Sequence, residues 1–141
     1  MKPELRRLAR LQRLEKIRGH AKQAAAREAA EAESTLAQLD ALASRTGRLL
    51  ADYSARVDAA DGAHLRMIAA FRAGLGGVSD SASADALQAR GLADEKHAAL
   101  ALAERRRQVV EDRAVGEAAA IARTAIAPTL GARRAIGTSL E

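Results

Sequence analysis

The stretch that decides the fold is LAQLDALASRTGRLLADYSARV, residues 36–57. Its apolar residues recur in alternating steps of three and four, which is the seven-residue repeat of a coiled coil. The repeat continues beyond this stretch, and only a threonine and a histidine interrupt its apolar character. We therefore predict one continuous helix over residues 3–72. The repeat positions are Leu36, Leu39, Ala43, Thr46, Leu50, Tyr53, Val57, Ala60, His64, Met67 and Phe71.

A turn is predicted where the repeat stops. Residues 73–85, AGLGGVSDSASAD, contain three glycines and several residues that favour helix N-termini. A second helix is expected over residues 83–126, ending before Pro128, and residues 128–141 are expected to form a flexible tail. The apolar stripe of this second helix consists of Leu87, Leu92, Ala99, Leu102, Val109, Val110, Ala114 and Ile121.

The fold class expected from these patterns is all-α. The chain has one tyrosine, one phenylalanine and no cysteine, which excludes a thick aromatic core and a disulfide framework. Neither helix can bury its stripe alone, so residues 1–127 are predicted to form one antiparallel two-helix coiled-coil hairpin. Because the second helix is the shorter one in this prediction, residues 3–29 would form an extended N-terminal arm without a partner in the chain.

The charge of the chain is concentrated in that arm. Residues 1–20 carry seven basic and two acidic side chains, and the remaining residues balance to zero. In LRRLARLQRLEKIRGH, residues 5–20, leucines at every third position wind around the helix instead of forming one stripe. Such a surface suits an acidic partner that surrounds the helix. The predicted contact residues are Leu5, Arg6, Arg7, Leu8, Arg10, Leu11, Arg13, Leu14 and Ile17.

Three other uses of the arm remain open. It could pack against the tail or against a second copy of the chain, with its arginines in water. It could bind nucleic acid, although it has no aromatic residue for base stacking. It could lie on a membrane surface, although it has no continuous apolar face.

A second contact surface is predicted near the turn. Ile68, Phe71, Leu75 and Val78 place bulky apolar side chains where a turn without function would be polar. The alternative is that Phe71 simply closes the seam of the coiled coil.

Four segments resemble the flagellar FliJ family, over roughly residues 3–118. They are LRRLARLQRLEKIRGHAKQAA, LAQLDALASRTGRLLADYSARV, MIAAFRAGLGGV and LAERRRQVVEDRAVGEAA. The resemblance implies an antiparallel coiled coil similar to the central stalk of rotary ATPases, whose terminal end enters the ring of the flagellar export ATPase. It also implies contacts with export chaperones and with the export gate, and a location on the cytoplasmic side of the inner membrane at the flagellar base.

The expected function is therefore a non-enzymatic stalk or adaptor that supports flagellar protein export and motility. The alternatives are a self-associating structural coiled coil and a basic helical protein that binds nucleic acid.

No catalytic or metal site is expected. The phosphate-binding loop of ATPases is missing, so any ATPase activity would belong to a partner. His20, His64 and His97 have no second ligand at metal-binding spacing. No cofactor or small-molecule substrate is predicted, and neither a signal peptide nor a membrane-length apolar stretch is recognised, which favours the cytoplasm.

Overall fold

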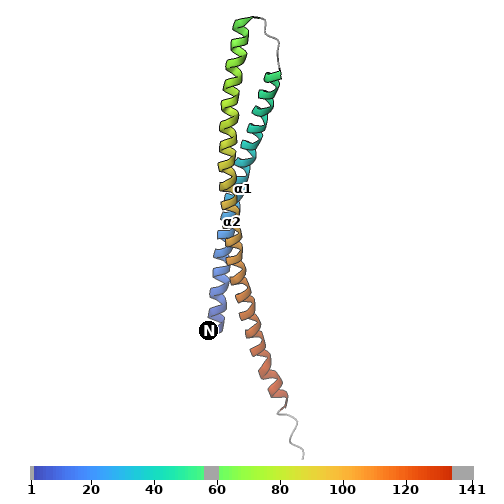
Figure 1. Ribbon diagram of the computed structural model, residues 1–141. Helices are drawn as coiled ribbons and strands as arrows, with labels where there is room; N and C mark the ends of the chain where they lie inside the picture. The colour runs from blue at the N-terminus through green and yellow to red at the C-terminus, as the bar shows by residue number, and fades with distance from the viewer. Residues whose placement is uncertain (1, 56–60, 135–141) are drawn as a thin grey trace, which may run out of the picture. The chain divides into compact units, whose positions relative to one another are not determined.

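The computed structural model describes residues 2–55 and 61–134, and these residues lie in two long helices. Helix α1 spans Pro3–Ala55 and helix α2 spans Gly62–Arg134. Figure 1 shows the two helices side by side and running in opposite directions. The predicted all-α antiparallel hairpin is confirmed, and the described residues contain no strand.

The predicted position of the turn is wrong. Residues 73–85 lie inside α2, so the chain reverses between Ala55 and Gly62, and the expected single helix over 3–72 is interrupted there. The Oδ1 atom of Asp61 accepts a hydrogen bond from the backbone N–H of His64 at 2.7 Å, which caps the start of α2. None of the described glycines has a positive φ, so the glycine-rich segment is compatible with a helix. The repeat positions Val57 and Ala60 lie outside the described residues.

The position of the reversal sets which residues face each other. In the pairs Glu28–Lys96 and Tyr53–Phe71 the two residue numbers add up to 124, and in Glu15–Arg107 they add up to 122. The N-terminal part of α1 therefore lies against α2. The prediction that residues 3–29 have no partner in the chain is therefore wrong. A reversal nearer the N-terminus makes α2 long enough to cover the apolar positions along nearly all of α1.

The chain divides into two compact units. Unit 1 contains Met1–Ala24 and Leu100–Glu141, and unit 2 contains Ala25–Ala99. Each unit is a pair of antiparallel helical segments, and the statements that follow concern their described residues.

In α1 the residues that face α2 follow the seven-residue repeat without a break. All of them are buried or half-buried. They are Leu8, Leu11, Glu15, Arg18, Lys22, Ala25, Ala29, Ala32, Leu36, Leu39, Ala43, Thr46, Leu50 and Tyr53. We call these positions, and their counterparts in α2, the seam.

The seam of α2 differs from the stripe predicted for the second helix. Of the predicted stripe, Val110, Ala114 and Ile121 are covered, as expected. Leu87, Leu92, Ala99, Leu102 and Val109 are exposed, and the neighbouring Ala86, Ala93 and Ala103 are covered instead. Alanine at these seam positions lets the two helices approach closely, because its side chain is small. His64 and Met67, predicted to continue the first seam, are exposed as well. The seam of α2 consists of Leu75, Ser79, Ala82, Ala86, Ala89, Ala93, Lys96, Leu100, Ala103, Arg107, Val110, Ala114, Glu117 and Ile121.

The C-terminal boundary is also different from the prediction. Helix α2 includes residues 128–134, which were expected to belong to the tail. Proline fixes φ near the helical value, so at Pro128 the helix loses one hydrogen bond and continues. Residues 135–141 lie outside the described part of the chain.

Replacing Gly77 by alanine distinguishes a helix from a turn at this position. A Cβ atom at Gly77 meets nothing within 4 Å, so Gly77→Ala should raise the free energy of unfolding by about 1 kcal/mol through helix propensity alone. Thermal unfolding followed by circular dichroism measures this change. A loss of stability would show that Gly77 needs a backbone conformation that alanine avoids, as in the turn first predicted.

The cap at Asp61 gives the complementary test. Asp61→Ala should lower the free energy of unfolding by about 1 kcal/mol, because it removes the acceptor of the His64 N–H bond. Asp80→Ala is the matched control: Asp80 is exposed inside α2 and caps no helix. Equal effects of the two substitutions in denaturant unfolding would contradict a helix start at Gly62.

Candidate partner-binding site

The nine residues predicted to contact a surrounding partner all lie on α1 in unit 1. Leu8 and Leu11 are half-buried in the seam, facing α2. The other three apolar residues are exposed: Leu5 by 43%, Leu14 by 38% and Ile17 by 62% of their surface. The structure therefore splits the predicted set into seam residues and residues that a partner can reach. The four arginines of the set, Arg6, Arg7, Arg10 and Arg13, are exposed.

These arginines form a basic surface along the first turns of α1. Arg6, Arg10 and Arg13 line a hollow of about 210 Å³ together with Ala9. Arg7 bonds to Glu117 of α2 at 3.5 Å. Guanidinium groups gathered in this way suit carboxylate or phosphate groups of a partner.

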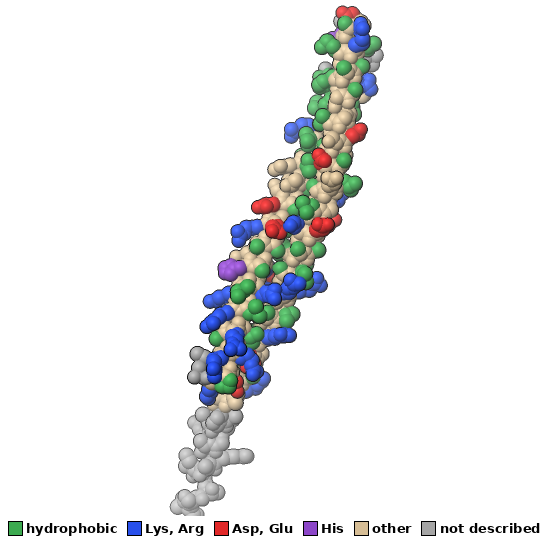
Figure 2. Space-filling model, turned by 90° about the vertical axis from the view of Figure 1, so that its left-hand side faces the viewer, with side chains coloured by type: hydrophobic (Ala, Val, Ile, Leu, Met, Phe, Trp, Pro, Cys, Tyr) green, Lys and Arg blue, Asp and Glu red, His purple; other side chains and the backbone are tan. Residues whose placement is uncertain are grey.

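Helix α2 adds further positive charge to unit 1. The segments that make up this unit carry fifteen Lys and Arg against seven Asp and Glu, for a net charge of +8, whereas residues 25–99 have eight against eleven, for a net charge of −3. Figure 2 shows Lys and Arg side chains mixed with apolar ones on one face of unit 1, in the lower part of the view. The exposed arginines that α2 contributes are Arg105, Arg106, Arg113 and Arg123.

Exposed apolar side chains also come from both helices of unit 1. They occupy different positions of the seven-residue repeat, so they point away from the helix pair in several directions. The α2 members were missed as contact residues because the sequence analysis counted two of them as core. No local signal separates them from the residues that face α1, because the seam beside them mixes small, large apolar and charged side chains. The full set is Leu5, Leu14, Ile17, Leu102, Val109, Val115 and Ile126.

Charged residues occupy the seam of unit 1. The Arg107 guanidinium donates from Nε and Nη2 to the two carboxylate oxygens of Glu104, each at 3.1 Å. Its Nη1 donates to Glu111 at 3.0 Å and lies 3.9 Å from Glu15 of α1. The carboxylates of Glu104 and Glu111 raise the pKa of Arg107 above its ordinary value, chiefly through the hydrogen bonds to Glu104.

The same carboxylate of Glu104 links the two helices. Lys22 of α1 lies 2.9 Å from it. Hydrogen bonds from Arg107 and then from Lys22 lower the pKa of Glu104 to about 2. Nearby, the Nε atom of Arg18 is buried without a hydrogen-bond partner among the described residues. The seam of unit 1 thus includes ion-paired side chains, whereas most seam positions of unit 2 hold alanine or leucine.

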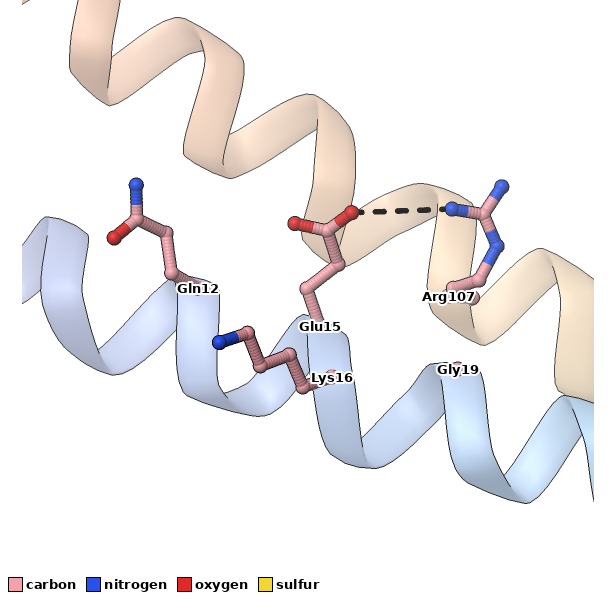
Figure 3. A pocket seen from close by; sticks show the side chains of 5 residues that line it. All are labelled: Gln12, Glu15, Lys16, Gly19 and Arg107. Atoms are coloured by element: carbon pink, nitrogen blue, oxygen red, sulfur yellow. Dashed lines mark ion pairs between the residues drawn. The ribbon is translucent and has the colours of Figure 1, made fainter.

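A shallow pocket of about 500 Å³ lies beside this network. Figure 3 shows four residues of α1 along its wall, with the ion pair between Glu15 and Arg107 crossing to α2. The side chains are charged or amide groups, which suit contacts with water and with charged groups. Its lining residues are Gln12, Glu15, Lys16, Gly19 and Arg107.

The second predicted surface lies in unit 2, at the start of α2. Ile68 and Leu75 are half-buried, whereas Phe71 and Val78 are about half exposed. The ring of Phe71 lies 4.7 Å from that of Tyr53, centroid to centroid. Phe71 therefore contributes both to the closure of the hairpin and to its surface.

Within residues 2–55 and 61–134, no three potential metal-binding side chains are gathered. No described helix has the length and apolarity that a membrane span requires. Comparison with known proteins finds no matching protein family, no similar curated protein and no similar solved structure.

The Glu104 network predicts an acid-sensitive stability. A carboxylate with a lowered pKa stabilises the folded state above its ordinary pKa of 4.5, and this contribution is lost as the pH falls toward 2. Wild-type protein should therefore unfold at progressively lower temperature between pH 4.5 and 2. Glu104→Gln should lower the melting temperature near neutral pH and have no effect near pH 2.

The control for this series is Glu95→Gln, which removes an exposed carboxylate of unit 2. Melting temperatures by circular dichroism over the pH range compare the three proteins. If Glu104→Gln and Glu95→Gln have the same pH profile, the ion pairs of Glu104 do not stabilise the fold.

Proposed function

We propose that this chain is a non-enzymatic coiled-coil stalk or adaptor of the flagellar protein export apparatus. In this proposal unit 1, which contains the beginning of α1 and the C-terminal part of α2, enters the ring of the export ATPase. The proposal rests on the resemblance of the sequence to the FliJ family and on the surface chemistry of unit 1. It places the chain on the cytoplasmic side of the inner membrane, at the base of the flagellum.

The observation that carries the proposal is the distribution of exposed groups around unit 1. A flat partner uses one side of a helix pair, whereas a ring contacts it from several sides. Leu5, Ile17 and Val115 occupy three different positions of the seven-residue repeat, and all three are exposed. Arginines from both helices lie between such residues. An acidic ring would match both the charge and the circumferential arrangement.

The proposal includes a second partner at unit 2. Phe71 and Val78 would contact the export gate through their exposed surface, with Ile68 and Leu75 supporting them from the edge of the seam. Export chaperones are further candidate partners, implied by the family resemblance alone.

Stimulation of the cognate export ATPase tests the role of unit 1. Ile17→Asp introduces a charge at a side chain that is 62% exposed, so the hairpin should fold while the apolar contact is lost. We expect at least a tenfold weaker stimulation in the full chain, equal to about 1.4 kcal/mol of binding free energy. The matched control is Leu87→Asp in unit 2, at a side chain that is 72% exposed, which should stimulate like wild type.

The arginines provide a second variant with a different signature. Arg6→Glu, Arg10→Glu and Arg13→Glu together should weaken binding, and the loss relative to wild type should shrink as salt is added, because exposed charges are screened. Ile17→Asp should show little such dependence on salt. Full stimulation by both variants would exclude unit 1 as the surface that contacts the ATPase.

A further inference from the structure

The seven-residue repeat gives each unit two chemically different sides. We label the repeat a to g, with Leu8 and Ser79 at position a, so that the seam occupies a and d. In an antiparallel pair the e positions of the two helices meet along one side and the g positions along the other. The ion pairs Asp40–Arg90 at 3.7 Å and Glu33–His97 at 3.2 Å join e positions. We call the opposite side, formed by positions g and c, the g side.

The g side of unit 2 is apolar and acidic. A groove of about 360 Å³ lies along it, and its lining includes Leu42, Val78, Gly74 and Gly77. A Cβ atom at either glycine would meet nothing within 4 Å, so the chain's own packing does not require these glycines. The exposed bulky residues of this side are Leu42, Leu49, Met67, Phe71, Val78 and Leu92. Its charged residues other than histidine are Glu28, Glu31, Arg45, Asp52, Asp85 and Glu95.

The g side of unit 1 is apolar and basic. Leu14 and Ile17 of α1 and Leu102 and Val109 of α2 are exposed on it. No carboxylate occupies a described g or c position of this unit, because its acidic residues lie at seam, e or f positions. The arginines of this side are Arg7, Arg10, Arg106, Arg113 and Arg123.

We propose that the g side of unit 1 in one copy of the chain binds the g side of unit 2 in a second copy. The two sides match in apolar character and are opposite in charge. Pairing unit 1 with unit 1 would bring arginines together without a carboxylate, and pairing unit 2 with unit 2 would gather carboxylates around one arginine. Charge complementarity therefore selects unlike units, and the exposed leucines and valines supply the apolar contact.

This association goes beyond the proposed stalk function and does not depend on it. It covers Leu14, Ile17 and Arg10, which the export ATPase would contact in that proposal, and Val78, which the export gate would contact. An acidic partner of unit 1 would thus compete with the second copy. Self-association then keeps both surfaces covered until a partner displaces it.

Sedimentation velocity of the purified full chain, without any partner protein, tests the association. Wild-type protein should form dimers or larger species at low ionic strength and dissociate at least tenfold more readily at high salt. Val78→Asp on the g side should abolish the association. Leu87→Asp is the control, since Leu87 occupies a b position away from the g side and is more exposed than Val78.

Two charge-reversal variants test which units meet. One carries Arg106→Glu and Arg113→Glu in unit 1, and the other carries Asp85→Lys and Glu95→Lys in unit 2. Each variant alone should be monomeric with wild-type helicity by circular dichroism. In a mixture of the two, the wild-type unit 1 of the second variant can bind the wild-type unit 2 of the first. The mixture should therefore regain a one-to-one complex.

Three results would overturn the proposal. The first is a wild-type chain that stays monomeric at low salt up to about millimolar concentration, where contacts worth about 4 kcal/mol become visible. The second is association of either variant alone. The third is a mixture without a complex while wild type associates, which would show that these charges do not pair between unlike units. Because the ATPase is absent from all of these measurements, their outcome is separate from that of the stalk proposal.

Discussion

The antiparallel seam between α1 and α2 is the contact on which the rest of the structure depends. In unit 2 it is built from alanines, and Ala29, Ala32, Ala89 and Ala93 are buried there. Alanine loses no side-chain rotamers on folding and allows helix axes to approach closely. Thr46 is the one buried polar residue among those described. Its hydroxyl donates a hydrogen bond to the carbonyl of Leu42 at 2.9 Å, so this hydroxyl is not left without a partner in the seam.

Unit 1 uses a different chemistry in the same repeat. Its seam contains Glu15, Arg18, Lys22 and Arg107. Glu15, Lys22 and Arg107 are held by ion pairs that water can reach. Such pairs contribute about 0–1 kcal/mol each, and the buried Nε atom of Arg18 without a partner works against them. The unit proposed to enter the ATPase ring is therefore the one whose helix pairing relies less on apolar burial. An acidic partner would compete for the same basic groups that join its helices.

The sequence was sufficient for the fold class and for the α1 seam from Leu36 to Tyr53, because their regular spacing has one simple explanation. It was not sufficient for the reversal. Glycine permits a turn but does not require one, and the segment around Gly77 stays helical since Leu75, Ser79 and Ala82 continue the repeat. The reversal instead precedes Asp61, which carries only a short capping signal.

The error in the turn propagated to the candidate site. A reversal near residue 78 left the N-terminal leucines uncovered, whereas the structure places Leu8 and Leu11 in the seam and exposes Ile17. It also hid the contribution of α2, because Leu102 and Val109 were placed on the apolar stripe of the second helix. Local composition cannot show which residues of α2 face α1. That depends on a register set by contacts far apart in the sequence.

One distance tests this register most directly. The chain contains no cysteine, so spin labels can be placed at Arg13→Cys and Asp112→Cys alone. Both residues are exposed and point away from the seam of unit 1. The structure predicts a distance of about 25 Å between the two spin labels, which is the width of two packed helices with their labels. Double electron–electron resonance measures this distance. A reversal within residues 73–85 would place Asp112 opposite residue 44, and a distance above about 45 Å would contradict the structure.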